Sequence, residues 1–532
     1  MKRILIYLFV LAATIGSAAK TLTIAEADKK LRLAEQIILN YYVDELDNDE
    51  VVTEAIRSML STLDPHSAYT DPKETEELTK PLEGKFSGIG VAFNLISDSV
   101  YVVSTVAGGP SERVGIQAGD RIIMAGDSSL VGRDRTAVMG FLRGDKGSKV
   151  DLKIRRGKED IIFRVTRDDI PIHSVDAAYM ADPTTGYIRI SRFAEDTANE
   201  VLEALVKLDK KGMKNLIIDL QDNTGGYLGS AYELAEIFLH KGDPVVSTKG
   251  SRVKPMNYDT QRDGLMTEGR LVILVNQFSA SASEILAGAI QDNDRGLIVG
   301  RRTFGKGLVQ RPFPMPDGSM IRLTTARYYT PSGRCIQKPY TKGRRDDYDH
   351  DIIDRFNNGE LTNADSLREM PDSLRFSTLR NKRAVYGGGG IQPDLFVPLD
   401  TVSRTDYYRD LVAKGVINQY TLSYVDNNRA ELKKKYKNED KFLKSFEVTD
   451  DMIEQLVARG EQDSIVCNRE QLAISLPTIK CVVKGLIMRD IFDDSSYYRV
   501  ANQISDIFNR GFELINNKEE YERLLSGQQQ TH

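Results

Sequence analysis

The chain has 532 residues, of which 41% are hydrophobic and 28% charged, so it is long enough to bury the cores of several domains. Its 72 lysines and arginines nearly balance its 77 aspartates and glutamates, which leaves a formal net charge of -5. This balance excludes the basic excess of nucleic-acid-binding proteins and a charge-driven acidic tail, and we expect no nucleic-acid partner.

The N-terminal residues have the composition of a secretory signal. Two basic residues precede an apolar run from Ile4 to Ile15, and small residues follow it. Because this run is too short to span a bilayer comfortably, it favours a signal peptide over residues 1–19, with an uncleaved membrane anchor as the alternative. No other stretch is expected to reach membrane-spanning length. The mature protein is therefore expected to be soluble and periplasmic, and to contact the membrane only through an uncleaved signal.

Hydrophobic periodicity divides the remaining chain into segments of different character. We predict an N-terminal helical region, a β-rich domain, a core of alternating strands and helices, and a C-terminal helical extension, over residues 20–82, 83–168, 169–400 and 401–532. The alternation indicates an α/β core. Residues 341–380 are polar and charged, and they predict a mobile insertion or loop with little core.

The cysteines do not carry chemistry. Cys335, Cys467 and Cys481 are too few and too scattered for a disulfide framework or a zinc site. Cys467 and Cys481 can pair in an oxidising compartment, or both can remain buried thiols, and the sequence does not decide between these alternatives. The chain has no cluster with metal-ligand spacing and no nucleotide motif, so we expect neither a metal nor a cofactor.

The stretch "FSASASEILAGAI" from Phe278 to Ile290 places three serines between a strand and a helix. The continuous apolar run "LVILV" before it predicts a buried strand, and apolar residues at helical spacing follow it. A serine at a helix entrance has unpaired N–H groups and the positive end of the helix dipole beside it, as a nucleophile that attacks a carbonyl requires. The alternative is a plain helix cap, and we predict that Ser283 has this role.

A histidine base is hard to supply for such a nucleophile. The nucleophile elbow of α/β-hydrolases needs glycines where this chain has Ser279 and Ser283. The five histidines are scattered, and none has a motif-like setting: His66, His173, His240, His350 and His532. A Ser-His-Asp hydrolase is therefore disfavoured.

Lysine is the other available base. Lys306 lies between Gly305 and Gly307, and such neighbours allow the close backbone approach that a side chain in a tight site needs. Burial would lower its pKa enough to leave the amine neutral. The amide of Gln310, four residues on, shares its face and can orient the amine. The alternative is an ordinary lysine in a β-turn.

A glycine pair follows another buried strand. In "NLIIDLQDNTGGYLGSAYELA" the strand ends at Asp219, and Gly225 and Gly226 precede a helix. Backbone amides in this position often cradle an anion, so either glycine can form half of an oxyanion hole. The alternative is an ordinary helix start.

Together these stretches resemble the carboxyl-terminal processing peptidases, serine proteases with a Ser-Lys dyad. The resemblance covers roughly residues 55–400, in seven motifs that occur in the family's order: "LDPHSAY", "FSGIGV", "DLQDNTGG", "NQFSASASEI", "TFGKGLVQ", "TPSGRCIQ" and "YGGGGIQPD". It implies that Ser281 is the nucleophile, Lys306 the base and Gln310 the third residue. The implied oxyanion donors are the N–H of Ala282 and that of Gly225 or Gly226. The chain departs from the family at Gln221, where an arginine that braces the loop is usual.

The β-rich domain resembles a PDZ domain. This resemblance implies that the loop of Gly88, Ile89, Gly90 and Val91 cups a terminal carboxylate while the peptide adds as a strand. The alternative is a PDZ-like barrel that only packs on the core and binds no peptide.

The fold expected from these resemblances is α/β, with a crotonase-like ββα core, an inserted β-rich PDZ domain, and helical N- and C-terminal regions. The expected function is that of a serine endopeptidase that recognises the free C-terminal tails of protein or peptide substrates. The alternative is a non-catalytic PDZ-containing protein that binds peptides or hydrophobic ligands. The sequence leaves open whether the chain forms a homo-oligomer.

Overall fold

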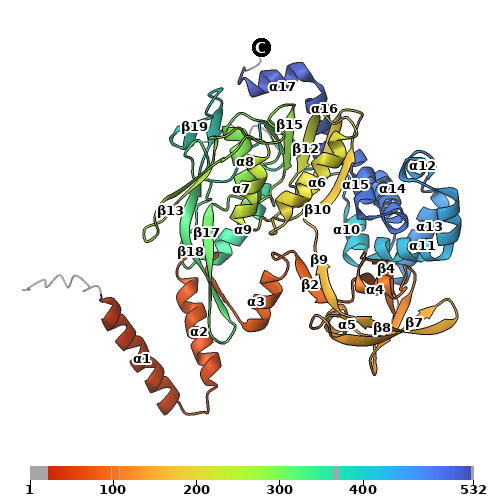
Figure 1. The fold of residues 1–532 in the computed structure, drawn as a ribbon, viewed down its shortest axis with the longest axis horizontal. Coiled ribbons are helices and arrows are strands. Elements are labelled where there is room, and N and C mark those ends of the chain that lie inside the picture. Colours follow the sequence, from red (N-terminus) through yellow and green to blue (C-terminus); the bar gives the residue numbers. More distant parts are fainter. Residues whose placement is uncertain (1–21, 97–98, 107, 364–370, 529–532) are drawn as a thin grey trace, which may run out of the picture.

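The computed structural model describes residues 22–96, 99–106, 108–363 and 371–528. The predicted signal peptide over residues 1–19 lies outside the described residues. Figure 1 shows an α/β body from which the N-terminal helices project, with a small β-rich domain and a group of C-terminal helices beside one another on the opposite side.

The N-terminal region is helical, as its periodicity predicts. Thr23 and Glu26 form a capping box that starts α1 (Ile24–Tyr41), and Asp47 caps α2 (Asn48–Ser61). No residue of α1 is buried. The chain then forms the short strand β1 (Ala68–Thr70) and α3 (Pro72–Thr79), which leads into the β-rich domain.

The β-rich domain is an antiparallel sheet in the order β3-β4-β5-β7-β8, so β3 lies at an edge. Its elements are β2 (Lys85–Gly88), β3 (Val91–Ile96), β4 (Ser99–Thr105), α4 (Pro110–Arg113), β5 (Arg121–Ala125), β6 (Ser128–Ser129), α5 (Arg135–Leu142), β7 (Lys149–Arg156), β8 (Glu159–Thr166) and β9 (Asp168–Pro171). Alternate residues of these strands point into one core that includes Val100, Ile122 and Leu152, all fully buried. Strands β2 and β9 pair with each other and connect this domain to the body.

A mixed six-stranded sheet forms the centre of the body, in the order β10-β11-β12-β15-β16-β21. These strands are β10 (Val175–Met180), β11 (Thr185–Ile190), β12 (Asn215–Asp219), β15 (Leu271–Val275), β16 (Leu297–Gly300) and β21 (Leu395–Phe396). Only the β10–β11 pair is antiparallel among them. Strands β12 and β15 are buried along their whole length, as continuous apolar runs predict for parallel strands covered on both faces.

Helices cover both faces of this sheet. On one face lie α6 (Thr197–Asp209), α7 (Leu228–Glu236) and α8 (Ala282–Asp292), which share a core with the strands (Figure 1). On the other face lie α16 (Asp506–Asn516) and α17 (Lys518–Leu525), at the end of the chain. The last part of the extension therefore packs on the central sheet of the body.

A second, antiparallel sheet carries the loop region around Lys306. It has the order β1-β18-β13-β14, with β17 also paired to β18. Its remaining strands are β13 (Pro244–Lys249), β14 (Met256–Asp259), β17 (Leu308–Pro314) and β18 (Met320–Tyr329). The mixture of helix and strand fits the expected α/β class, while the crotonase-like architecture remains a prediction.

The polar segment 341–380 contains more structure than predicted. Helix α9 (Arg345–Asn357) buries Tyr348 and Arg355, so the expectation of little core was wrong for this part. Tyr348 packs edge-on against the rings of His66 and Phe304. After residues outside the description follow η2 (Asp372–Leu374), β19 (Arg375–Ser377) and β20 (Ala384–Tyr386).

The rest of the C-terminal extension is a helical cluster with its own core. Its members are α10 (Asp406–Ala413), α11 (Val416–Lys435), α12 (Glu439–Ser445), α13 (Asp450–Gln462), α14 (Arg469–Ile491), α15 (Asp494–Ala501) and η3 (Asn502–Ile504). Among the described residues, α14 alone is long and apolar enough to cross a membrane, so the expectation that no stretch after the signal reaches such length was wrong. In this structure 56% of its apolar window is buried, and it packs against α10, α11 and α15. Cys335, Cys467 and Cys481 are all free thiols.

Candidate active site

Ser281 lies where β15 leads into α8, in a backbone conformation that serine rarely adopts. Its φ of 56° falls in the left-handed region, and this costs of order 1–3 kcal/mol unless the surroundings hold it. Two contacts hold it here: the Ser281 N–H donates to Glu284 Oε2 at 2.8 Å, and Tyr328 Oη donates to the Ser281 carbonyl at 3.1 Å. The side chain is partly exposed at the start of the helix.

The three serines of the motif have different roles. Ser279 Oγ donates to the Leu220 carbonyl at 2.8 Å, and Ser283 Oγ donates to the Asn223 carbonyl at 2.9 Å; both side chains are fully buried. The prediction that Ser283 caps the helix was wrong, because Ser281 is the N-cap residue and Ser283 lies inside the helix. Of the three hydroxyls, only that of Ser281 donates no hydrogen bond within the described residues.

Glu284 joins the Ser281 turn to the Lys306 loop. Its buried carboxylate accepts from Thr303 Oγ1 and the Gly305 N–H on one oxygen, and from the N–H groups of Ser281 and Lys306 on the other, at 2.5–2.9 Å. Burial raises the pKa of Glu284, and the four donors act in the opposite direction by favouring the carboxylate. The sequence reasoning missed this residue, although its spacing from Ser281 is that of a capping box.

Lys306 has the environment of a base. Burial, and after it the nearby positive charge of Arg322, lower the pKa of Lys306 to about 8, against smaller opposing effects of Glu284 and Asp64. The flanking glycines are sterically required: a Cβ on Gly307 would come within 2.7 Å of the Gln337 backbone, and Gly305 has a φ of +87°. Tyr328 Oη also lies 2.8 Å from the Lys306 carbonyl, so its single proton is shared between the two carbonyls and this one side chain contacts both parts of the predicted dyad.

Ser281, Lys306 and Gln310 line one cavity of roughly 430 Å³, together with both glycines of the predicted oxyanion loop. Within the described residues, no hydrogen bond joins Ser281 Oγ to Lys306 Nζ. The amide of Gln310 donates to Thr324 Oγ1 at 3.4 Å and not to the lysine. The structure thus brings the three predicted residues together, with space between them that a substrate can enter.

The two glycines of the oxyanion loop are not equivalent. The Gly225 N–H donates to Asn223 Oδ1 at 2.9 Å, so it is occupied. The N–H groups of Gly226 and Ala282 have no partner within the described chain. Gly226 lines the same cavity as Ser281, and Ala282 follows Ser281 in the sequence. Neither glycine tolerates a side chain: a Cβ on Gly225 would come within 2.8 Å of Ser281 Cβ, and one on Gly226 within 2.0 Å of the Phe193 carbonyl oxygen.

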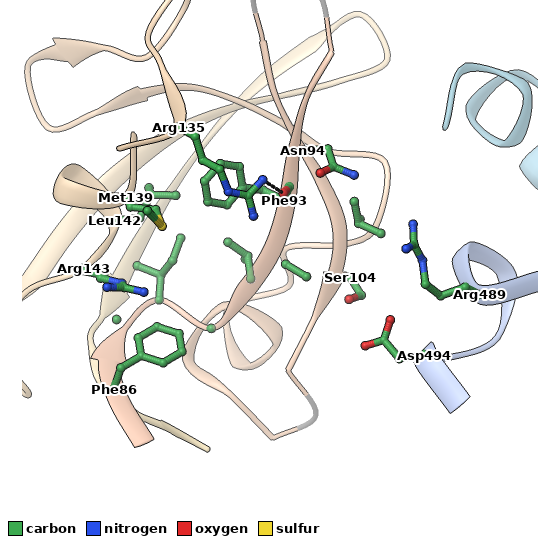
Figure 2. A pocket seen from close by; sticks show the side chains of 16 residues that line it. Phe86, Phe93, Asn94, Ser104, Arg135, Met139, Leu142, Arg143, Arg489 and Asp494 are labelled. Atoms are coloured by element: carbon green, nitrogen blue, oxygen red, sulfur yellow. Dashed lines mark hydrogen bonds between the residues drawn. The ribbon is translucent and has the colours of Figure 1, made fainter. Parts of the chain in front are cut away.

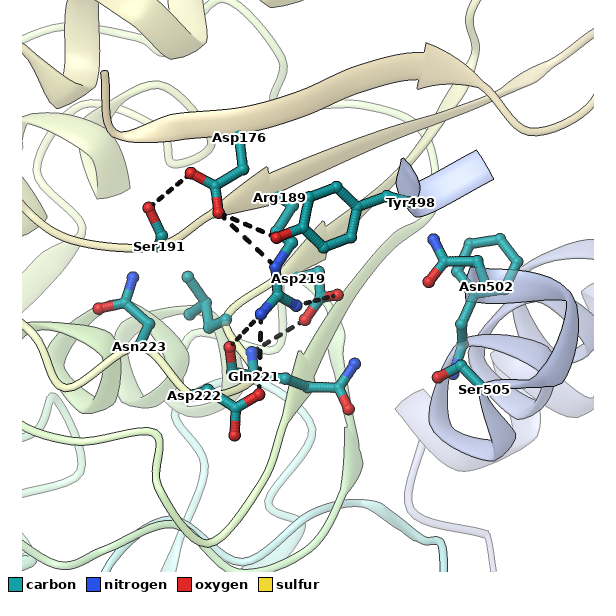
Figure 3. Close-up of polar contacts among 12 residues, drawn as sticks. Asp176, Arg189, Ser191, Asp219, Gln221, Asp222, Asn223, Tyr498, Asn502 and Ser505 are labelled. Atoms are coloured by element: carbon teal, nitrogen blue, oxygen red, sulfur yellow. Dashed lines mark hydrogen bonds and ion pairs between the residues drawn. The ribbon is translucent and has the colours of Figure 1, made fainter. Parts of the chain in front are cut away.

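Arg189 on β11 braces the loop where the family's arginine is replaced by Gln221. Its guanidinium donates to Asp219 Oδ2 at 2.9 Å and to the Gln221 carbonyl at 3.0 Å (Figure 3). Asp219 also accepts from Tyr187 Oη. Tyr498 of α15 lies over the guanidinium, 4.9 Å from the ring centroid. An arginine from the neighbouring strand and an aromatic ring from the C-terminal extension therefore support the loop before Gly225.

The "LDPHSAY" stretch also lies at the site, although its sequence position did not suggest this. Asp64 accepts from Ser67 and from Thr324 Oγ1, the same hydroxyl that the Gln310 amide contacts. Burial and the charge of Lys306 lower the pKa of His66 to about 3, and Tyr348 Oη lies 3.0 Å from its Nε2. A histidine with this pKa is neutral at physiological pH and is a weak base.

The predicted peptide-binding loop opens onto a second cavity, of roughly 340 Å³ (Figure 2). Gly88, Ile89, Gly90 and Val91 all line it. The N–H groups of Ile89 and Gly90 have no partner within the described chain, and Gly90 has a φ of +73° that turns the loop. The apolar side chains around the cavity come from β2, β3 and α5: Phe86, Phe93, Met139 and Leu142. Arg489 and Asp494 of the C-terminal extension line it as well.

Comparison with known families defines the class of protein. The sequence model of Peptidase family S41 matches residues 184–349, and that of the PDZ domain matches residues 87–166. The models of the activating protease CtpB N-terminal domain and of a family of unknown function match residues 12–75 and 407–493. The chain is thus a serine-type peptidase with a PDZ domain.

Its relatives define the family more narrowly. The chain is 36% identical over 325 residues to the carboxy-terminal processing protease CtpB of Bacillus subtilis. The aligned region covers 59% of this chain and 67% of the relative. It is 32% identical over 343 residues to CtpA of the same organism, at 63% and 73% coverage. The solved photosystem II D1 C-terminal processing protease is 30% identical, with a TM-score of 0.35, and covers 58% of this chain and 83% of that one. The chain belongs to the carboxy-terminal processing proteases of peptidase family S41, and its substrates are proteins or peptides.

Proposed function

We propose that the chain is a serine endopeptidase that binds the free C-terminal tail of a flexible protein at the PDZ groove and cleaves it with Ser281 and Lys306. The observation that carries this proposal is the shared cavity of Ser281, Lys306 and Gly226. It combines a hydroxyl that donates no hydrogen bond within the described residues, an amine with a pKa of about 8, and an unpaired N–H in one accessible space.

The proton steps follow from these groups. Neutral Lys306 takes the Ser281 proton as Oγ attacks the carbonyl carbon of the scissile bond, and the resulting oxyanion accepts from the N–H groups of Ala282 and Gly226. The protonated lysine then gives its proton to the leaving amine, so the C–N bond breaks and an acyl-enzyme remains. Water repeats the sequence: Lys306 removes its proton, hydroxide attacks the ester, and Ser281 recovers its proton from the lysine.

Substrate binding is proposed to begin at the PDZ groove. The unpaired N–H groups of Ile89 and Gly90 can donate to a terminal carboxylate, and the edge strand β3 is available for pairing with an added strand. Arg143, whose guanidinium lies 4.9 Å from the Phe86 ring, lines the same cavity and adds a positive charge. The side chain of the last substrate residue would then enter the apolar part of the groove.

The test uses an unfolded protein substrate and tail peptides with the wild-type chain. Ser281→Ala and Lys306→Ala should each lower turnover at least about a thousandfold, while the exposed-lysine control Lys342→Ala should cleave normally. A mass increase equal to the acyl group, found on the Ser281 peptide after quenching, would identify the nucleophile. Equal turnover by wild type and Ser281→Ala would refute the assignment.

The same experiment separates the rival functions. Binding of tail peptides without cleavage by the wild-type chain would favour a non-catalytic peptide-binding protein. Activity that survives Lys306→Ala but not His66→Ala would favour a histidine-based hydrolase, which the pKa of about 3 at His66 argues against.

We also propose that the protein acts in the periplasm. The support is the basic and apolar composition of residues 1–19. Fractionation of cells that express the full chain, with N-terminal sequencing of the mature protein, would show a start near residue 20 if this is correct.

A further inference from the structure

We propose that the C-terminal helical extension completes the PDZ groove, and that Asp494 selects a basic side chain at the next-to-last position of the substrate tail. The proposal rests on the tail recognition proposed above and adds the residue that reads one position of the tail. It assigns a role in substrate selection to the α14–α15 junction.

The PDZ domain is docked on the extension by a partly buried polar cluster around Tyr101. Tyr101 of β4 is fully buried, and its hydroxyl donates to Asp426 of α11 at 3.0 Å. Asp426 also pairs with Arg121 of β5 at 3.4 Å. Arg429, one turn further along α11, contacts Tyr101 Oη at 3.4 Å and donates to the Asp490 carbonyl at 2.9 Å. One arginine therefore fixes the end of α14 relative to the PDZ sheet.

This docking places two charged side chains in the wall of the groove. Arg489 at the end of α14 and Asp494 at the start of α15 line the same cavity as the loop of Ile89 and Gly90. Figure 2 shows both on the side of Ser104 and Asn94, across the strand from Met139 and Leu142. The groove therefore has one side, made by the PDZ domain, that carries its apolar side chains together with Arg135 and Arg143, and one side, made by the extension, that carries Arg489 and Asp494.

An added strand presents its side chains to these two sides in turn. Along β3 itself, Phe93 is in the PDZ core, whereas Ala92 is exposed and is paired with Ser104 of β4. If the last substrate side chain enters the side made by the PDZ domain, the next-to-last side chain points to the opposite side, where Arg489 and Asp494 lie.

The charges on that side favour a cation. Both Nε and Nη2 of Arg489 lie 3.0 Å from Asp490 Oδ1, and the Asp490 side chain is 0% exposed, so this arginine already has an acidic partner. Asp494 is exposed and its carboxylate has no ion pair within the described residues. An incoming lysine or arginine would give Asp494 a partner, whereas a glutamate would be repelled by it.

The test measures peptide affinity with the full chain carrying Ser281→Ala. Fluorescent decapeptides that end in alanine, with lysine, glutamine or glutamate at the next-to-last position, are compared by anisotropy. We expect lysine to bind about three- to tenfold more tightly than glutamate. Asp494→Asn should remove this preference and Asp494→Lys should reverse it. Asp410→Asn, an equal charge change on α10 away from the groove, should leave it unchanged.

The outcomes separate this inference from the proposed function. Peptides with an amidated C-terminus should bind weakly to every variant, and equal binding of acid and amide would refute tail recognition itself. Retained carboxylate dependence with the same lysine preference in wild type and Asp494→Asn would overturn the role of Asp494 alone. A preference for glutamate that Arg489→Gln abolishes would also overturn it.

Discussion

The charge on Arg322 should set the pH at which the enzyme becomes active. Arg322 lines the cavity of Ser281 and Lys306, and its positive charge is the largest contribution after burial to the low pKa of Lys306. With a pKa of about 8, roughly 9% of the lysine is neutral at pH 7 and about half at pH 8. Replacing Arg322 by glutamine removes the repulsion that disfavours the protonated amine, so the pKa of Lys306 should rise.

The expected size of this effect follows from the neutral fraction. Below its pKa the neutral lysine falls tenfold for each pH unit, so a modest rise in pKa lowers kcat/KM at pH 7 by about three- to tenfold. Near pH 10 the lysine is largely neutral in both proteins, and the two rates should converge. The variant's profile is therefore the wild-type profile moved to higher pH.

The assay is kcat/KM for a fluorogenic peptide without ionisable side chains, from pH 5 to pH 10.5, with folding checked by circular dichroism at each pH. Arg311→Gln, which removes an exposed charge from β17 outside the cavity, controls for net charge and should keep the wild-type midpoint. An unchanged midpoint in Arg322→Gln would refute the electrostatic argument. A loss of rate that persists at pH 10 would instead place Arg322 in substrate contact.

Three further substitutions test the site. Lys306→Met should abolish cleavage yet raise the free energy of unfolding at pH 7 by about 1–3 kcal/mol, because the folded state no longer holds a disfavoured charge. This gain in stability should vanish above the unfolded lysine pKa of about 10.5. Urea titrations at pH 7 and 10.5 measure both values. Glu284→Gln should lower both kcat and the unfolding free energy, the latter by about 1–3 kcal/mol, since an amide N–H₂ would face donors. Arg189→Lys should lower kcat about tenfold with little change in KM, because lysine cannot contact Asp219 and the Gln221 carbonyl together; equal effects on both constants would contradict a positioning role.

The sequence predicts those parts of the site whose signals are local. Ser281 and Lys306 lie in short motifs between a strand and a further element, and glycines mark the places where backbone comes close. The sequence did not indicate Arg189 or Asp64, because their roles depend on which strands become neighbours. Gly226 is favoured over Gly225 as an oxyanion donor because the Gly225 N–H donates to Asn223 Oδ1, and no spacing in the sequence predicts that hydrogen bond.

The same limit explains the misassigned helix cap and the overlooked histidine. Any serine at a helix entrance can cap the helix. Here the Ser283 hydroxyl instead donates to the Asn223 carbonyl, a contact that depends on the tertiary structure. His66 is far from Lys306 in the chain, and its approach depends on β1 pairing with β18. Periodicity and motifs therefore could not predict the contacts between segments that are distant in the sequence.

The C-terminal extension should prove inseparable from the protease core, and a single glycine tests this. Helix α16 packs on β12, β15 and β16, and a Cβ on Gly511 would come within 2.6 Å of Leu274 Cδ2. Gly511→Ala should therefore lower the free energy of unfolding by about 1–3 kcal/mol through overpacking. Gly229→Ala in α7, where a Cβ would meet nothing within 4 Å, should instead be neutral or stabilising by up to about 1 kcal/mol.

Urea unfolding of the full-length variants provides both values. A Gly511→Ala protein as stable as Gly229→Ala would contradict the packing of α16 on the sheet. Truncation after residue 400 is a stronger version of the test. It removes Ile507 and Leu514 of α16, and it therefore exposes the sheet residues that they cover, such as Val272 and Leu274. We expect the truncated chain to be insoluble or unfolded, whereas a soluble and active truncated protease would show that the extension is an independent module.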